Sequence, residues 1–277
     1  MSDAPRNAPE PAPGRRSAAR KALLAALAAT LGLGAALWFG GVLPRPAPVP
    51  APIAAAPADP ATLVARMLAT PDYAPFFDTL AARFPAEGAQ LKDAFAARAA
   101  ADPAAATADR FVADALKTLR ETRGVVAAKA DAPAMARVFE AQGAMIAALR
   151  AADARLCVDF VYGGASDAFM AFASANRAPF AAVARANLDA ILDGAEKKIV
   201  RERPGDEDFA ALEAALRAKG MGDAEIAALL DGKTPDPPLP DERMCEAAGA
   251  YVAAMLALPE PARARMMALA IELMARS

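Results

Sequence analysis

The chain has 277 residues, of which 56% are hydrophobic and 23% are charged. Alanine makes up much of the hydrophobic fraction, and because alanine favours helix but buries little area, the composition predicts helices more than a large core. Six of the 31 basic and three of the 33 acidic residues lie in the first 60 positions, which leaves 25 basic against 30 acidic residues afterwards. This mildly acidic main part lacks the basic surface of a nucleic-acid-binding protein, so no nucleic-acid partner is expected.

Residues 22–43 form a long uncharged stretch near the N-terminus. As a helix, at about 1.5 Å per residue, they would cross a hydrocarbon core of about 30 Å. Four basic residues lie between positions 15 and 21, whereas only Arg45 follows the stretch closely. Because positive charge favours the cytoplasmic side, we expect a single-pass inner-membrane anchor, with residues 1–21 as a cytoplasmic basic tail and the C-terminal domain in the periplasm.

A cleavable signal peptide is the alternative interpretation of residues 1–56. Ala54, Ala55 and Ala56 provide a small-residue cleavage motif, although such a motif arises easily in an alanine-rich chain. The apolar stretch is longer than the roughly 7 to 15 residues of a signal-peptide core, which favours the anchor.

Small residues recur at every fourth position of the anchor. They are Ala28, Gly32, Ala36 and Gly40. On a helix these residues form one narrow face against which a second helix can pack closely. They are therefore candidate contacts for a homodimer, and the alternative is that the spacing is a chance result of the alanine and glycine content.

Residues 44–60 contain seven prolines. Proline removes backbone hydrogen-bond donors and favours the extended polyproline II conformation. At about 3.1 Å per residue, a linker of this length spans roughly 40 to 50 Å. We expect this Pro/Ala-rich extended linker to hold the following domain away from the membrane, and the alternative is a tether without such a role.

From Asp59 onward, apolar residues recur at three- and four-residue spacing, which is the period of amphipathic helices. Asp59 and Pro60 match a helix start, in which an acidic cap precedes proline. Further breaks are expected at Pro71, Pro75, Pro85, Pro103, Pro133, Pro179 and Pro204. Residues 196–208 and 231–240 are expected to be the longest surface loops. The sequence thus predicts an all-α fold, a multi-helix bundle of short proline-punctuated helices, with residues 61–277 as one exported all-helical domain.

Cys157 and Cys245 are the only cysteines. An even count in an exported domain predicts one disulfide, and the alternatives are two buried thiols or a redox-active pair. Both cysteines end the pattern Asp-x-Arg-apolar-Cys, at residues 153–157 and 241–245. The repeated pattern indicates an internal duplication or a coincidence.

Histidine is absent from the chain. This excludes a histidine general base, the serine and cysteine triads that use one, and, with only two cysteines, the usual zinc sites. The glycine-rich motifs of phosphate and dinucleotide binding are also absent. We therefore expect no cofactor and no metal, and the enzyme chemistry that remains is that of paired carboxylates, as in glycoside cleavage.

The stretch from Cys157 to Phe172 sets polar groups among aromatic and aliphatic neighbours. A carboxylic acid in such surroundings can have the raised pKa that a general acid needs. The candidate site residues are Asp159, Tyr162, Gly163, Gly164 and Asp167. The alternative is ordinary helix termination, in which the glycines end one helix and Ser166 or Asp167 caps the next.

A second candidate site follows the linker. Tyr73, Phe76 and Phe77 are close in sequence and would form an exposed groove for a partner peptide. The alternative is core packing, because Phe76, Phe77 and Leu80 share one helix face.

The layout of tail, membrane span, stalk and external domain predicts a non-catalytic adaptor or scaffold that binds another envelope protein or a cell-wall component. The alternative is a carboxylate-dependent hydrolase of cell-wall polymer, with Asp159 or Asp167 as the acid and a second carboxylate about 5 to 9 Å away. An external sensor is disfavoured because the cytoplasmic tail is too short to hold an output domain.

Overall fold

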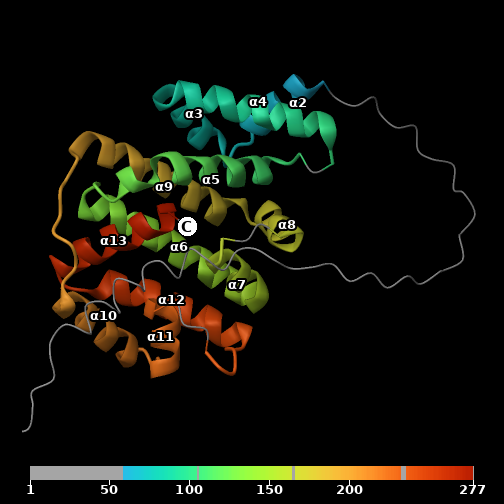
Figure 1. Cartoon of the computed structure of the whole chain (residues 1–277). Helices are drawn as coiled ribbons and strands as arrows, with labels where there is room; N and C mark the ends of the chain where they lie inside the picture. The colour runs from blue at the N-terminus through green and yellow to red at the C-terminus, as the bar shows by residue number, and fades with distance from the viewer. Residues whose placement is uncertain (1–58, 105, 164–165, 232–234, 277) are drawn as a thin grey trace, which may run out of the picture.

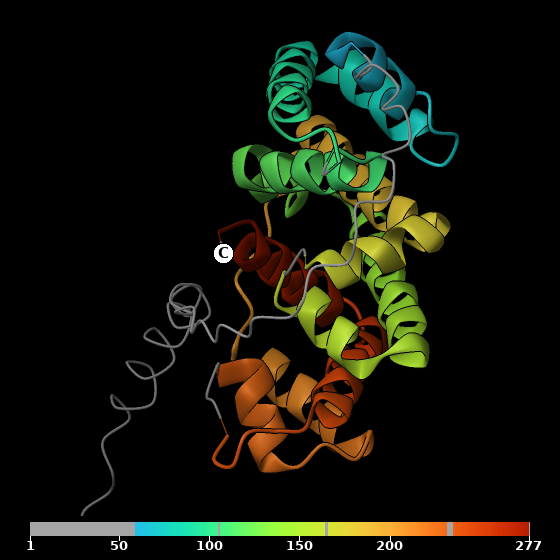
Figure 2. The same ribbon diagram turned by 90° about the vertical axis from the view of Figure 1, so that its right-hand side faces the viewer.

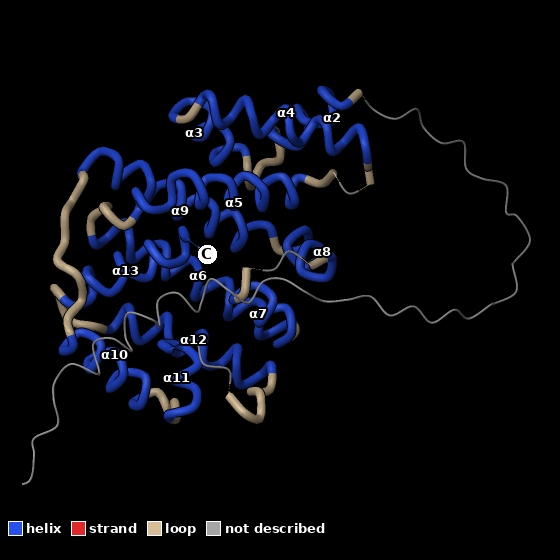
Figure 3. The backbone as a smooth tube through the Cα atoms, viewed as in Figure 1, coloured by secondary structure: helices blue, strands red, loops and turns tan. Residues whose placement is uncertain are grey.

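The computed structural model describes residues 59–104, 106–163, 166–231 and 235–276. These ranges contain twelve helices and no strand (Figure 3), which confirms the predicted all-α bundle. The helices are α2 (Pro60–Leu68), α3 (Ala74–Arg83), α4 (Pro85–Ala101), α5 (Ala108–Ala127), α6 (Ala132–Ala152), α7 (Ala154–Val161), α8 (Asp167–Ala175), α9 (Arg177–Lys197), α10 (Asp206–Ala218), α11 (Asp223–Asp231), α12 (Asp241–Ala257) and α13 (Ala262–Arg276).

Several helices begin at short polar side chains. The Asp59 carboxylate accepts a hydrogen bond from the Thr62 backbone N–H at 3.3 Å, and the Asp131 carboxylate accepts one from Ala134 at 2.8 Å. Each cap supplies an acceptor for an N–H group that the first helical turn leaves unpaired. Prolines lie in the first turn of α2, α3, α4 and α6, where the missing N–H costs no helical hydrogen bond. The helix start predicted at Asp59 is therefore confirmed.

The helices are arranged in successive groups (Figures 1 and 2). Helices α2, α3 and α4 pack together at one end, and α10, α11 and α12 lie at the opposite end. Between them, α9 packs against α5 and α6, while α13 packs against α5. The C-terminal helix thus lies in the middle of the bundle, beside a helix from the first half of the chain.

Aromatic side chains pack the group of helices α2, α3 and α4 against the rest of the bundle. Phe111 of α5 is stacked between Phe77 of α3 and Phe95 of α4, with ring centroids 4.8 and 4.3 Å apart. Phe180 of α9 meets Tyr73 edge to face at 6.3 Å. Such aromatic pairs add about 0.5 to 1.5 kcal/mol each beyond the area that they bury. The core at this end therefore depends on contacts between α3, α4, α5 and α9.

The connection from α9 to α10 follows the surface of the bundle. Lys198 ends α9 in the left-handed conformation, with φ of 51°. The next residue, Ile199, donates its backbone N–H to the Lys129 carbonyl at 3.0 Å. The Arg201 guanidinium donates to the Ala128 carbonyl at 3.1 Å, which satisfies an acceptor that the end of α5 leaves free. The loop that the sequence places at residues 196–208 is thus limited to residues 198–205.

Among the described residues, no helix is both long enough and apolar enough to cross a membrane. The predicted tail (residues 1–21), the predicted membrane helix (residues 22–43) and all but the last two residues of the linker (44–60) lie outside the described ranges. The same holds for the small-residue face made by Ala28, Gly32, Ala36 and Gly40. The anchor, the linker and the homodimer contact stay predictions.

The packing of α9 on α5 predicts a clear effect of Gly194→Ala. A Cβ atom at Gly194 would lie 2.1 Å from the Val126 carbonyl oxygen, and because that oxygen is backbone, the helices must move apart. We expect the free energy of unfolding to fall by about 1 to 3 kcal/mol or more, as measured by chemical denaturation.

Gly88→Ala in α4 is the matched control. A Cβ atom at Gly88 would lie 3.5 Å from the Ala81 Cα, which is an ordinary contact. Because alanine favours helix over glycine, this variant should be more stable by about 0.5 to 1 kcal/mol. A Gly194→Ala variant as stable as the wild type would contradict the close approach of α5 and α9.

Candidate functional site

Cys157 of α7 and Cys245 of α12 are fully buried, and their sulfur atoms lie 2.01 Å apart. The predicted pair is therefore at disulfide-bonding distance. It joins two helices that pack against each other although the cysteines are 88 residues apart in the chain. In the chain-entropy view, closing a loop of this length stabilises the fold by about 4 to 5 kcal/mol.

The two Asp-x-Arg-apolar-Cys segments meet at this disulfide, but their arginines make different contacts. Arg155 lies 3.6 Å from Asp159 and 3.7 Å from Asp241. Arg243 instead pairs with Glu225 of α11 at 2.6 Å. The repeated pattern therefore does not produce equivalent surroundings for the two halves.

The two candidate acids, Asp159 and Asp167, face different partners. Asp159 accepts a hydrogen bond from the Ser166 hydroxyl at 2.8 Å. Asp167, at the start of α8, pairs with Arg110 of α5 at 2.8 Å, and its side chain is fully exposed. The hydrolase alternative requires an acid in apolar surroundings that remove water from the carboxyl group. Asp167 is fully exposed, so it lacks such surroundings.

The remaining members of this candidate site lie at the turn between α7 and α8. Tyr162 is 53% exposed, and its hydroxyl oxygen lies 4.0 Å from the Met244 sulfur. Gly163 has φ of 70°, the left-handed conformation that commonly ends a helix. The Ser166 hydroxyl accepts the backbone N–H of the third residue of α8 at 3.2 Å. Helix termination, the alternative from the sequence, thus describes Gly163 and Ser166, while Gly164 lies outside the described residues.

The aromatic candidate groove is in the core. Tyr73, Phe76 and Phe77 are only 0%, 1% and 4% exposed. Their rings pack inside the bundle, so none of them offers a surface to a partner. The core-packing alternative is the arrangement that the structure shows, because the helix face that they share is covered by α4, α5 and α9.

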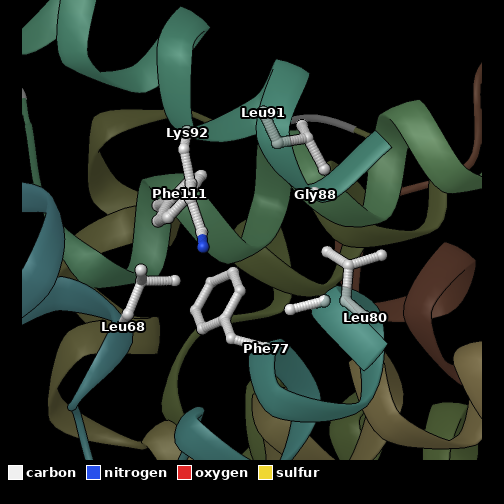
Figure 4. Close-up of a pocket in the computed structure, with 8 residues that line it drawn as sticks. Leu68, Phe77, Leu80, Gly88, Leu91, Lys92 and Phe111 are labelled. Carbon is white, nitrogen blue, oxygen red and sulfur yellow. The ribbon is translucent and has the colours of Figure 1, made fainter. Parts of the chain in front are cut away.

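A small pocket lies beside Phe77 (Figure 4). Its walls include Leu80, Leu91 and Phe111, and Lys92 also lines it. Its volume of about 10 Å³ is roughly what one water molecule needs. Ligand pockets are commonly about 300 to 1,000 Å³. This hollow is therefore a small packing gap between α2, α3, α4 and α5.

A buried polar network that the sequence interpretation missed joins α5, α9 and the start of α3. Asp109 is 1% exposed and accepts hydrogen bonds from the Tyr73 hydroxyl at 2.7 Å and the Arg177 Nε at 3.1 Å. Burial raises the pKa of Tyr73, and the hydrogen bond to Asp109 raises it further, so Tyr73 is a neutral donor. The hydrogen bond to Asp109 also raises the pKa of Arg177. No sequence signal connects residues that are 36 and 68 positions apart.

A second buried carboxylate joins α10 to α13. Asp208 is 5% exposed and accepts hydrogen bonds from Arg265 at 2.9 and 2.7 Å and from the Gly205 backbone N–H at 2.9 Å. The hydrogen bonds from Arg265 hold the pKa of Asp208 below its usual range. Its place three residues after Gly205 is a capping position, which is the one signal of this role in the sequence.

Tyr73→Phe tests the Asp109 network. The variant removes a hydroxyl that donates to a buried carboxylate, and we expect the free energy of unfolding to fall by about 1 to 3 kcal/mol. Tyr162→Phe is the control, since that hydroxyl is exposed, and its effect should stay within about 0.5 kcal/mol. Equal effects of the two substitutions in chemical denaturation would contradict the network.

Asp208→Asn tests the second carboxylate through pH. Because Arg265 lowers the pKa of Asp208 in the folded state, the unfolded chain takes up the proton first as pH falls. The stabilisation is therefore complete at neutral pH and is lost below about pH 4. We expect Asp208→Asn to be less stable than the wild type at pH 7, with a difference that shrinks towards pH 3 in thermal denaturation. A difference that does not change with pH would contradict the ion pair, and Asp78→Asn, at an exposed position, is the control.

The disulfide, the exposed turn beside it and the two buried carboxylates are the features from which a function can be argued. No protein family, no curated protein and no solved structure matches this chain.

Proposed function

We propose that this chain is a membrane-anchored envelope protein whose helical domain is exported and binds another envelope component without catalysing a reaction. The observation that carries the export is the buried Cys157–Cys245 pair at disulfide distance. Disulfides persist in oxidising compartments such as the periplasm and are rare in the reducing cytosol. A disulfide that joins two packed helices supports a domain that folds outside the cytosol.

The N-terminal sequence supports the same proposal. The uncharged stretch at residues 22–43 is preceded by a cluster of basic residues, and this order favours an orientation in which the following chain lies outside the cytoplasm. The proline content of residues 44–60 favours a stiff spacer, which we expect to span roughly 40 to 50 Å. Such reach suits a domain that meets a partner away from the bilayer.

The contacts of the candidate acids Asp159 and Asp167 favour binding over catalysis. A glycoside hydrolase needs an acid and a second carboxylate on either side of one substrate. Here Asp159 contacts Ser166 and Asp167 contacts Arg110. By contrast, Val161 and Tyr162 are large apolar residues with 37% and 53% exposure on the end of a disulfide-held helix, and tyrosine with a wet hydroxyl is typical of binding surfaces.

Cysteine labelling in spheroplasts tests the export. In a Cys157→Ala/Cys245→Ala background, a membrane-impermeant maleimide should label Ala253→Cys, on the exposed side of α12, without permeabilisation. Ser2→Cys, in the predicted cytoplasmic tail, should label only after permeabilisation. In the otherwise unchanged chain, both native cysteines should react only after reduction and unfolding.

Labelling of Ala253→Cys only after permeabilisation would place the domain in the cytoplasm and overturn the export. Formaldehyde crosslinking of the full chain in intact cells tests the binding separately. We expect an adduct with another envelope component, and a chain that stays uncrosslinked would overturn this part of the proposal.

A further inference from the structure

The segment before α12 presents proline side chains to the solvent. Pro237, Pro238 and Pro240 are exposed, and Leu239 between them is half-buried. The segment follows α11 and leads directly into α12, at the end of the bundle opposite to α2–α4 (Figure 1).

From Pro237 to Pro240 the backbone is restricted towards polyproline II, and this stretch begins after the cis peptide bond between Asp236 and Pro237. The proline ring fixes φ near −65°, and a residue that precedes proline is kept out of the helical region. Pro240 has φ of −57° and ψ of 150°, which lie in the polyproline II region. With three residues per turn, Pro237 and Pro240 fall on the same face of such a helix.

The segment is joined to a rigid part of the bundle. The Pro240 carbonyl accepts the Met244 backbone N–H at 2.9 Å, and Asp241 lies 3.7 Å from Arg155 of α7. Cys245, which forms the disulfide, follows one turn later. Because one end is fixed and the prolines restrict the rest, a partner that binds this segment loses little entropy in ordering it.

The charges around the segment are acidic. Asp236 precedes it and Glu242 follows it, and both are exposed with no ion-pair partner among the described residues. Arg155 lies near Asp241, but Asp236 and Glu242 remain available to a ligand of opposite charge. A partner surface that carries lysine or arginine would complement them.

We propose that residues 237–240, flanked by the exposed carboxylates of Asp236 and Glu242, are the docking segment for a partner protein that has an aromatic-lined groove with basic residues at its rim. Aromatic grooves recognise polyproline II segments through prolines three positions apart on one face, which here are Pro237 and Pro240. Tyr162, whose hydroxyl oxygen lies 4.0 Å from Met244 in the first turn of α12, adds an exposed aromatic ring near the start of that helix. This inference rests on the proposed binding function and names the surface that performs it.

Site-specific photo-crosslinking of the full chain in cells tests this proposal. The crosslinking amino acid p-benzoylphenylalanine replaces Pro238, so that Pro237 and Pro240 are both kept. We expect a light-dependent adduct with one other protein, and we expect Pro237→Ala/Pro240→Ala to lower its yield by about tenfold or more. Asp236→Lys/Glu242→Lys should lower the yield as well, because it reverses the charge that faces a basic rim.

The matched control is Pro71→Ala/Pro75→Ala, which removes two exposed prolines at the other end of the bundle and should leave the adduct unchanged. Thermal denaturation of each purified full-length variant shows that the fold is kept. An adduct that persists in Pro237→Ala/Pro240→Ala, or one with the mass of two copies of this chain, would overturn the inference. No adduct from position 238 in cells where formaldehyde still links the wild type to a partner would overturn it while leaving the proposed function intact. Failure of both crosslinkers would overturn both.

Discussion

The close approach of α9 to α5 is the constraint on which the remaining arrangement depends. Gly194 has no side chain, and a Cβ at its position would meet the Val126 carbonyl oxygen at 2.1 Å. Further along α9, Ala184 and Ala190 are fully buried. The absence of a side chain at Gly194 allows the backbones of α5 and α9 to come near each other, and the close contact gains dispersion energy that a larger residue would lose to clashes. Helices α3, α6 and α8 then pack on α9, so its position is transmitted to both ends of the bundle.

Alanine is common in the buried core beside larger Phe, Leu, Met and Val side chains, and similar small side chains fit many alternative packings. Two buried carboxylates help to select one helix packing over the alternatives. Asp109 requires Tyr73 and Arg177 together, and Asp208 requires Arg265. A buried charge without its partner is costly, so packings that separate these groups are disfavoured even where the net gain of each pair is small.

The disulfide works at a different place from these polar contacts. It holds the short helix α7 against the start of α12, next to the exposed Val161 and Tyr162 and to the proline segment before α12. An eight-residue helix is marginal by itself, because few hydrogen bonds offset the cost of its first turn. The covalent link therefore keeps this surface ordered. A rigid exposed surface at the end of the bundle opposite to α2 is consistent with the proposed role in binding.

The sequence by itself determined the features that depend on neighbouring residues or on counting. Helical periodicity, the cap at Asp59 and the prolines of the first turns are local, because a cap contacts an N–H only three residues away. The pairing of Cys157 with Cys245 could be predicted because the chain has only two cysteines. The same local argument described Gly163 and Ser166 as helix-terminating residues.

Only the tertiary structure decided which helix faces are covered and which polar groups meet. Burial of Tyr73, Phe76 and Phe77 depends on α4, α5 and α9, which lie elsewhere in the chain. The partners of Asp109 are 36 and 68 residues away from it, and no periodicity can report such a contact. Likewise, the apolar residues that neighbour Asp167 in the sequence do not show whether its side chain is buried or exposed. Its full exposure follows from the way α8 lies on α5, because burial is a property of the packed surface and not of the local sequence.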